Sequence, residues 1–401
     1  MKKKFKIAIF SDFNLKSGGA YNEANYLSEK IFDLADKSFE FVLINTSISS
    51  NFNTIKDIKK IKFHMNLLHR FICYLRNFNF FFKRFKKFFF KNKFEKFIDK
   101  NKIDLIIFTG PSQYSLYLEK TDFIITIPDI GHMENNEFPE WSKDGEFDRR
   151  EKILINSKKA FLILTNAVII AKKLINKCGF ENNRLKVISQ TVPAGIKKNS
   201  KIINIPNLEL PKKYIFYPAM YLPHKNHKYI IDTINHFKLK NKINLSAVFC
   251  GDDKGYLGDL KQYTKNLNLD NKVLFLNFVS NEQISFLYKN CFALTMPTFS
   301  GPTNIPPWEA FYHKKPVFYS SIFDIDKEYK DSVFYIDPLD ENTLINGLEE
   351  LYNNNSLYNI YCQKGDVMIK KNLFEKQVGD LIIEIKNLRK IKNSWKFYYD
   401  I

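Results

Sequence analysis

The sequence predicts an α/β protein with two Rossmann-like domains, each built on a parallel sheet. Short apolar runs alternate with amphipathic stretches along the 401 residues. Strands that alternate with helices in this way pair in parallel through crossover connections. The alternation occurs as two successive series, and this chain length suits two or three domains. Because open α/β sheets bind ligands at the carboxyl ends of their strands, two facing domains would hold a ligand in a cleft between them.

The first series of predicted strands is followed by a second, with a linker between them. The first series comprises 5–10, 41–45, 104–109, 123–127, 161–164 and 185–188. The second comprises 214–217, 245–250, 273–276, 292–296 and 317–319. Between the two series, 191–213 contains three prolines, several lysines and no helical period, which predicts a linker. We therefore assign 1–195 to an amino-terminal domain, 196–374 to a carboxyl-terminal domain and 375–401 to a helical tail that could pack back on the first domain.

The composition favours anionic partners. The net charge is +19, from 62 basic and 43 acidic residues, which suits nucleotides, anionic lipid surfaces or nucleic acid. The chain is also rich in Lys, Asn, Ile and Phe, so a compositional bias could produce the same excess. The cysteines are scattered without C-x-x-C spacing: Cys73, Cys178, Cys250, Cys291 and Cys362. This arrangement predicts reduced thiols in a cytoplasmic protein and no metal site.

Neither a signal peptide nor a membrane span is expected. The amino terminus, MKKKFKIAIFSDF, has a basic start but only a short apolar stretch, which reads as a first strand. No apolar run reaches the roughly 18 residues that a bilayer span needs.

The segment 297–317, PTFSGPTNIPPWEAFYHKKPV, carries the strongest functional signal. Pro306 and Pro307 suit the first turn of a helix, where a missing N–H costs little, and Asn304 can cap that helix. The free amides of the helix start would attract an anion, phosphate above all. Glu309, about one turn in, could accept hydrogen bonds from hydroxyls beside that phosphate. A diphosphate next to a sugar hydroxyl is typical of a nucleotide ligand.

Two further loops follow predicted strands and carry candidate ligand contacts. Gly18 and Gly19 follow the first strand and would let the backbone approach a ligand. Their spacing is not G-x-G-x-x-G, so a flexible turn remains an alternative. Lys225, with Asn226 and His227, follows the first strand of the second series. A lysine there can meet phosphate as a point charge, and a solvated basic loop is the alternative.

A third loop carries a histidine beyond a predicted strand. In IPDIGHMENNEFPEW, 127–141, Asp129 and His132 follow the strand at 123–127. The histidine could carry a proton or bind a sugar hydroxyl. A structural hydrogen-bonding role is the alternative.

The segment 76–97, RNFNFFFKRFKKFFFKNKFEKF, combines aromatic and basic residues at helical spacing. Phe78, Phe81, Phe82, Phe85 and Phe89 follow one helix face, with basic residues between them. A basic, aromatic, amphipathic helix suits an anionic membrane surface. The alternative is a core helix with solvated lysines. We interpret the segment as a core helix whose excess phenylalanines contact lipid or a partner.

Taken together, these segments resemble glycosyltransferase family 4, retaining sugar transferases of the GT-B fold that are also grouped as glycosyl transferases group 1. YPAMYLPHKNH, 217–227, is similar to the family segment whose lysine grips the donor diphosphate. The stretch 277–317 resembles the family's most specific block, and 127–141 resembles the acceptor-side loop that carries a histidine. The resemblance covers most of the chain and is weakest between 47 and 97.

The resemblance implies an activity and a cellular setting. It implies a metal-independent hexosyltransferase that moves a sugar, with retention, from a UDP- or GDP-linked donor to a hydroxyl of a saccharide or lipid-linked acceptor. The product would belong to cell-surface polysaccharide or lipopolysaccharide synthesis. The implied location is the cytoplasm. Attachment of the protein to the inner face of the cytoplasmic membrane through 76–97 is left open. No cofactor and no specific nucleic acid partner are expected.

The resemblance also implies residue roles. Lys225 would bind the donor phosphates. Asn304, Ile305 and Pro306 would form the helix-start wall, the first two through their backbone amides, since Pro306 has none. Glu309 would hold the ribose hydroxyls. His132 would contact the transferred sugar and the acceptor, so His132, Lys225 and Glu309 form the expected catalytic set.

Two departures from the family pattern accompany these roles. Gly18 and Gly19 would line the donor diphosphate or the acceptor, as in the family. However, the family commonly has two glutamates eight positions apart, and the partner of Glu309 falls at Gly301. The usual arginine in the strand-to-helix loop of the second domain also has no clear counterpart, with Met220 and Tyr221 standing nearby.

Two other classes of function remain open from the sequence. One is a GT-B-fold sugar-nucleotide epimerase, which product analysis without an acceptor would separate from a transferase. The other is a non-catalytic basic protein that binds membranes or nucleic acid. The second class predicts steeply salt-dependent binding to polyanions and no donor turnover.

Overall fold

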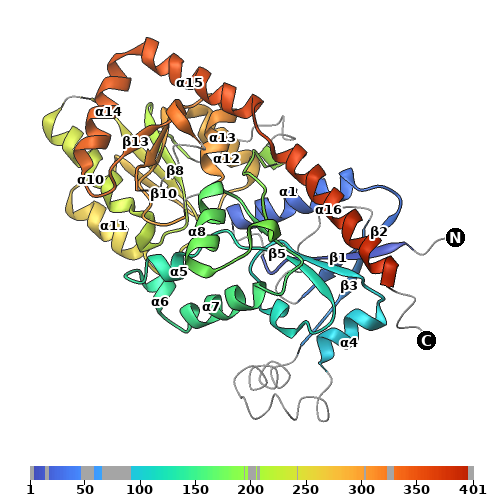
Figure 1. The fold of residues 1–401 in the computed structure, drawn as a ribbon. Coiled ribbons are helices and arrows are strands. Elements are labelled where there is room, and N and C mark those ends of the chain that lie inside the picture. The colour runs from blue at the N-terminus through green and yellow to red at the C-terminus, as the bar shows by residue number, and fades with distance from the viewer. Residues whose placement is uncertain are drawn as a thin grey trace. The chain divides into compact units, whose positions relative to one another are not determined.

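The computed structural model describes residues 4–13, 18–46, 58–65, 92–193, 195–196, 205, 208–241, 243–301, 304–322 and 329–395. The chain forms two compact units, each with its own parallel sheet (Figure 1). Unit 1 comprises Met1–Ile130, Gly145–Ile188 and Glu375–Ile401, and unit 2 comprises Gly131–Asp144 and Ser189–Phe374. The predicted fold class, α/β with two Rossmann-like parallel sheets, is confirmed.

Unit 1 contains a seven-stranded sheet in the order β3-β2-β1-β4-β5-β6-β7. Its strands are β1 (Phe5–Phe10), β2 (Phe39–Asn45), β3 (Lys59–Lys62), β4 (Leu105–Phe108), β5 (Asp122–Thr126), β6 (Leu162–Thr165) and β7 (Leu185–Val187). Neighbouring strands pair in parallel, with Ile7 opposite both Phe41 and Leu105. Helices cover both faces of such a sheet, which explains why its central strands read as continuous apolar runs.

The helices of unit 1 build two cores, one on each face of the sheet. They are α1 (Gly19–Leu34), α4 (Lys93–Lys100), α7 (Glu146–Ser157), α8 (Val168–Cys178) and α16 (Phe374–Trp395). On one face, Ile9 of β1 packs with Tyr21 and Ala24 of α1. On the other face, Phe10 packs with Phe94 of α4. Successive residues of β1 therefore point to opposite faces, as the period of a strand requires.

Unit 2 contains a six-stranded parallel sheet in the order β10-β9-β8-β11-β12-β13. Its strands are β8 (Tyr214–Pro218), β9 (Ser246–Cys250), β10 (Val273–Leu276), β11 (Ala293–Met296), β12 (Val317–Ser320) and β13 (Phe334–Ile336). Its helices include α5 (Gly131–Glu134), α6 (Pro139–Ser142), α10 (His227–Lys240), α11 (Leu257–Asn266), α12 (Asn281–Asn290), α13 (Pro306–Tyr312), α14 (Glu341–Asn353) and α15 (Asn355–Lys370). Counted from its first strand, the order is 3-2-1-4-5-6, the Rossmann order.

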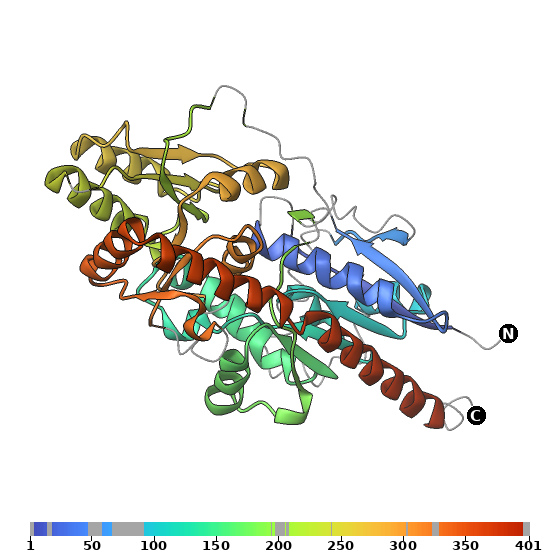
Figure 2. The same cartoon turned by 90° about the horizontal axis from the view of Figure 1, so that it is seen from above.

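The carboxyl-terminal helix α16 packs on unit 1. It buries one apolar stripe, formed by Val378, Leu381, Ile382, Ile385 and Leu388. Ion pairs fasten its length: Lys30–Glu375 at 2.9 Å, Lys386–Asp36 at 2.8 Å and Lys392–Asp122 at 2.7 Å. Figures 1 and 2 show α16 running along unit 1 toward the end where the amino terminus lies.

Three features differ from the sequence prediction or lie beyond its reach. The predicted strand set lacks β3, a lysine-rich edge strand, and β13, a short edge strand. Gly131–Asp144 is grouped with unit 2, whereas the predicted boundary assigns it to the first domain. The aromatic and basic residues at 76–91 lie outside the described residues. Within the described residues, no helix combines the length and the apolar character that crossing a membrane requires.

Candidate functional site

The unit 2 sheet has a topological switch point between β8 and β11. These strands are neighbours, but the chain leaves β8 toward β9 on one side and leaves β11 toward β12 on the other. In open α/β sheets, ligands bind at the carboxyl ends of strands at such a point. The loops that follow β8 and β11 are the two loops that carry Lys225 and the segment 297–305.

The loop after β8 fixes the position of Lys225. A short 3₁₀ helix, Pro223–Lys225, ends at Asn226, whose φ of 56° is left-handed. The Asn226 side chain donates a hydrogen bond to the Pro338 carbonyl at 2.9 Å. Asparagine tolerates the left-handed region better than most residues. The half-buried Lys225 is therefore the last residue of this turn. The residue that follows it, Asn226, is held in place by its hydrogen bond where the chain enters α10.

The loop after β11 is hydrogen-bonded to the Lys225 loop. The Phe299 amide donates to the His224 carbonyl at 2.8 Å, and the Thr298 hydroxyl lies 3.2 Å from the same oxygen. Two segments separated by about seventy residues are thus joined at the residue before Lys225. The described backbone of 297–301 and the lysine lie on the same edge of one sheet.

The start of α13 differs in detail from the prediction. Ile305 caps the helix and no side chain caps its amides, so the expectation that Asn304 is the cap is wrong. The side-chain amide of Asn304 instead donates to the Gly301 carbonyl at 2.6 Å and to the Tyr319 hydroxyl at 2.8 Å. This side chain closes the loop on itself. Gly301 has a φ of +86°, which side-chain-bearing residues rarely adopt.

Glu309 lies in the first turn of α13 and is 4% exposed. Burial raises the pKa of its carboxyl from 4.5 to about 7, against the opposing effect of a hydrogen bond with the Tyr288 hydroxyl. The Glu309 charge in turn helps to raise the pKa of Cys250, the last residue of β9. Because α13 follows β11 along the chain, the Glu309 carboxyl group lies at the carboxyl edge of the sheet. With a pKa of about 7, its neutral and ionised forms are both populated near neutral pH.

The segment 131–144 attaches to the Lys225 loop through Glu140 and His224. The Glu140 carboxylate accepts from the His224 amide at 3.1 Å and pairs with the Nδ1 of its ring. Burial acts to raise the pKa of Glu140, but the hydrogen bonds with His224 outweigh it and lower the pKa. Phe138 stacks on Phe299 with ring centroids 5.6 Å apart. His132, 2% exposed on α5, belongs to this attached segment.

Sequence reasoning missed the role of His224. Its carbonyl accepts hydrogen bonds from Phe299 and Thr298, and its amide and ring contact Glu140. His224 therefore connects its own loop to the loop after β11 and to the segment 131–144. The available signal was its position next to Lys225 in PHKN, but spacing cannot show which groups a histidine binds. The neighbouring His227 is fully buried among aromatic rings, and burial lowers its pKa to about 3. His227 is accordingly a neutral core residue.

The glycines of the first loop belong to unit 1. Gly18 precedes α1 with a φ of +56°, and a Cβ atom added there would meet nothing within 4 Å. The positive φ of Gly18, and not a lack of space for a side chain, therefore favours glycine at this position. Gly19 is the first residue of α1. Both follow β1, whose neighbour β4 marks the switch point of the unit 1 sheet.

Asp129 belongs to unit 1 and pairs with an arginine of α7. Asp129 lies 3.5 Å from Arg150, which also pairs with Glu146 at 2.6 Å. Across the described ranges, no group of three or more His, Cys, Asp or Glu side chains is placed to hold a metal ion.

Sequence comparisons connect unit 2 to sugar transferases. Residues 198–367 match the family described as glycosyl transferases group 1. Over 234 residues, the chain is 27% identical to the O-antigen chain mannosyltransferase RfbU of Salmonella typhimurium. That match spans 57% of this chain and 61% of the relative.

Solved structures share the fold over nearly the whole chain. A glycosyltransferase from Rickettsia africae has a TM-score of 0.64 at 14% identity, covering 98% of each chain. Sucrose-phosphate synthase from Thermosynechococcus elongatus has a TM-score of 0.69 at 11% identity, covering 97% of this chain and 100% of that one. Anabaena HepE in complex with UDP-glucose has a TM-score of 0.67 at 16% identity, covering 95% and 99%. With its two parallel-sheet units, the chain has the GT-B Rossmann-like fold.

Proposed function

We propose that the chain is a glycosyltransferase of family 4 that moves a hexose from a nucleoside diphosphate sugar to an acceptor hydroxyl, with retention. One observation carries the proposal. Lys225, the described backbone of 297–301 and the first turn of α13, which carries Glu309, all lie at the carboxyl edge of the unit 2 sheet, next to the β8–β11 switch point. This edge lies within the span that matches glycosyl transferases group 1.

The donor would be held by groups of unit 2. Lys225 supplies a positive charge to the diphosphate, and the amides of Asn304 and Ile305 face it from the loop before α13. Glu309 accepts hydrogen bonds from the ribose hydroxyls. Such contacts bind a UDP- or GDP-linked sugar, and the base is not distinguished by them. The UDP-glucose complex of HepE supports a nucleotide sugar as the donor class.

The reaction breaks the bond between the sugar C1 and the diphosphate oxygen and forms a bond from C1 to the acceptor oxygen. The acceptor proton passes to the departing diphosphate, so no protein nucleophile is needed. Lys225 stabilises the negative charge that develops on the leaving group. His132 contacts the transferred sugar and the acceptor. Because Lys225 supplies this charge stabilisation, we propose that turnover needs no metal and persists in EDTA.

The acceptor we propose is a saccharide or lipid-linked intermediate of surface polysaccharide synthesis. The name of the Salmonella relative, an O-antigen chain mannosyltransferase, supports this class. We further propose a cytoplasmic protein that attaches to the inner membrane face through 76–97. Gly18 and Gly19 line the acceptor or the donor diphosphate from unit 1.

The proposal is tested by incubating purified protein with UDP- and GDP-linked hexoses and a membrane extract as the source of acceptors. We expect release of one nucleoside diphosphate and a product with the anomeric configuration of the donor, read by NMR. Conversion of the donor sugar without an acceptor would instead indicate an epimerase. Binding of polyanions without turnover of any donor would contradict a catalytic role.

A further inference from the structure

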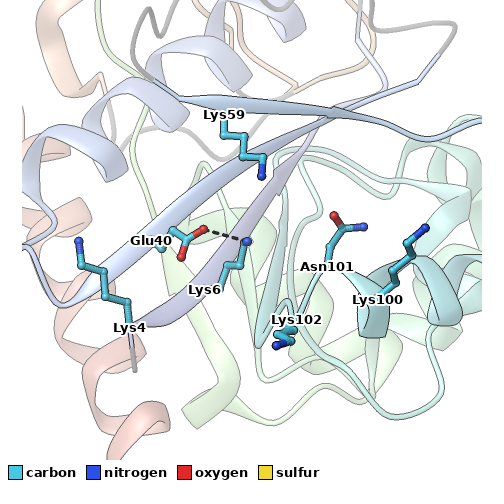
Figure 3. Close-up of a pocket in the computed structure, with 7 residues that line it drawn as sticks. All are labelled: Lys4, Lys6, Glu40, Lys59, Lys100, Asn101 and Lys102. Atoms are coloured by element: carbon cyan, nitrogen blue, oxygen red, sulfur yellow. Dashed lines mark ion pairs between the residues drawn. The ribbon is translucent and has the colours of Figure 1, made fainter. Parts of the chain in front are cut away.

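The amino edge of the unit 1 sheet carries a second concentration of positive charge. A cavity of about 310 Å³ opens there, which we name the lysine pocket. It is lined by Lys4, Lys6, Glu40, Lys59, Lys100, Asn101 and Lys102 (Figure 3). Figure 3 shows Lys6 of β1 and Lys59 of β3, the strands on either side of β2, reaching toward the middle of the cavity, with Lys4 and Lys100 on opposite sides.

The sheet topology explains why these lysines meet. Parallel strands all begin at one edge of a sheet, so residues at or just before strand starts become neighbours. Lys6 pairs in register with Glu40, and Lys59 pairs with Val42 two residues farther along β2. Leu105 lies opposite Ile7, which brings Lys102, just before β4, to the same edge. Lysines at separate positions in the sequence therefore form one cluster.

The charges of the lysine pocket are largely uncompensated. Lys6 pairs with Glu40 at 2.8 Å. Among the residues that the structure describes, Lys4, Lys59, Lys100 and Lys102 form no ion pair. Ammonium groups gathered around one cavity repel one another, and that repulsion is relieved when an anion enters. The Asn101 side chain adds an amide that can donate to the same anion.

The lysine pocket and the residues proposed to bind the donor belong to different units. The donor residues lie in unit 2, at the carboxyl edge of its sheet. The lysine pocket lies in unit 1, at the amino edge. A six-residue strand such as β1 places its two ends roughly 20 Å apart. The pocket therefore also lies away from the loop of Gly18, which follows the carboxyl end of β1.

We propose that the lysine pocket binds a phosphate-type oxyanion ligand with two or more negative charges. Lysines act as separate point charges and suit the several oxygens of phosphate groups, whereas planar carboxylate recognition favours the fork of arginine. None of the described residues that line this pocket is an arginine. The phosphates can belong to a soluble diphosphate or to anionic lipid headgroups, which share this chemistry.

The first arm of the test measures binding of inorganic pyrophosphate by calorimetry at low salt. Because the proposed donor site would also take a diphosphate, the titration uses the Lys225→Ala background. We expect the added pair Lys59→Gln and Lys102→Gln to weaken binding about tenfold or more. The pair Lys172→Gln and Lys240→Gln removes the same charge from exposed positions elsewhere and should leave the affinity within about twofold. Circular dichroism checks that all variants are folded.

The second arm measures co-sedimentation of the full chain with vesicles of phosphatidylcholine and cardiolipin, whose headgroup carries two phosphates. Loss of pyrophosphate binding in the pocket variant assigns the site to a soluble ligand. Loss of vesicle binding alone assigns it to a lipid headgroup. If the pocket variant and the control variant bind equally in both arms, or the starting protein binds in neither, the proposal is overturned. Neither arm uses donor turnover, so this outcome is independent of the proposed transferase activity.

Discussion

The protonation of Glu309 decides how this residue can act. Only the ionised carboxylate accepts hydrogen bonds with both oxygens, as a pair of ribose hydroxyls requires. The protonated form can instead donate to the Tyr288 hydroxyl, which itself donates to the Pro306 carbonyl at 3.2 Å. Because burial raises the pKa of Glu309 to about 7, nucleotide binding through it would release a proton near neutral pH.

The substitution Glu309→Gln should change how stability depends on pH. Between the ordinary pKa of 4.5 and the folded pKa of about 7, the folded protein holds a proton that the unfolded chain has lost. The free energy of unfolding of the wild type therefore falls as pH rises through this window, by up to about 3 kcal/mol. The glutamine variant lacks this fall. Urea unfolding on both sides of the window measures it, and parallel profiles for the two proteins would contradict a raised pKa.

At Gly301, where glycosyltransferase family 4 commonly has a glutamate, the backbone conformation favours glycine. With a φ of +86°, this position disfavours any residue with a Cβ atom, including the glutamate that the family usually has there. The sequence revealed the missing carboxylate through spacing alone. It could not reveal the left-handed backbone, because a glycine is compatible with either sign of φ.

The segment 131–144 is an element whose placement the sequence did not predict. Its helices are short, and its attachment to unit 2 depends on contacts of Glu140 and Phe138 with residues far along the chain. Spacing could place His132 beyond a strand but could not say which unit the histidine accompanies. In the structure, His132 belongs to the same unit as Lys225 and Glu309.

Breaking the contact between Glu140 and His224 should separate catalysis from donor binding. In Glu140→Ala, the segment loses its part-buried hydrogen bonds with His224, and we expect kcat to fall about tenfold or more. The donor KM should stay within about threefold, because Lys225 and Glu309 remain in place. Glu137→Ala, at an exposed position of the same segment, serves as the control. Equal kinetics for the two variants would show that the contact does not position the segment for the reaction.

Helix α16 offers a direct comparison of its buried and exposed faces. Ile385 is fully buried and Ile383 is 55% exposed, although both lie in the same part of the helix. We expect Ile385→Ala to lower the free energy of unfolding by about 2–5 kcal/mol and Ile383→Ala to change it by about 0.5 kcal/mol or less. Chemical denaturation measures both. Similar losses would mean that α16 does not pack on unit 1 through this face.

The whole chain shows which information a sequence carries about a fold of this kind. The runs from 5–10 to 317–319 correspond to strands because both faces of each sheet are covered, so burial leaves a continuous apolar signature. Edge strand β3, KKIK, lacks that signature, since its lysines lie at the solvated edge. The sequence predicted those parts of the candidate site that lie in one segment, as in 297–317. It did not predict the part at His224, where segments distant in the sequence meet.

Comparing the kcat/KM of Lys225→Ala with that of Lys228→Ala shows whether the donor diphosphate binds beside Lys225. Lys228 lies three residues on, exposed, with its ammonium 4.9 Å from the centre of the Tyr263 ring, and it carries the same charge. With the nucleotide sugar that the wild type turns over, we predict a loss of about a hundredfold or more for Lys225→Ala and a change within about twofold for Lys228→Ala. Equal rates for wild type, Lys225→Ala and Lys228→Ala would contradict a donor diphosphate bound at the β8–β11 edge of unit 2.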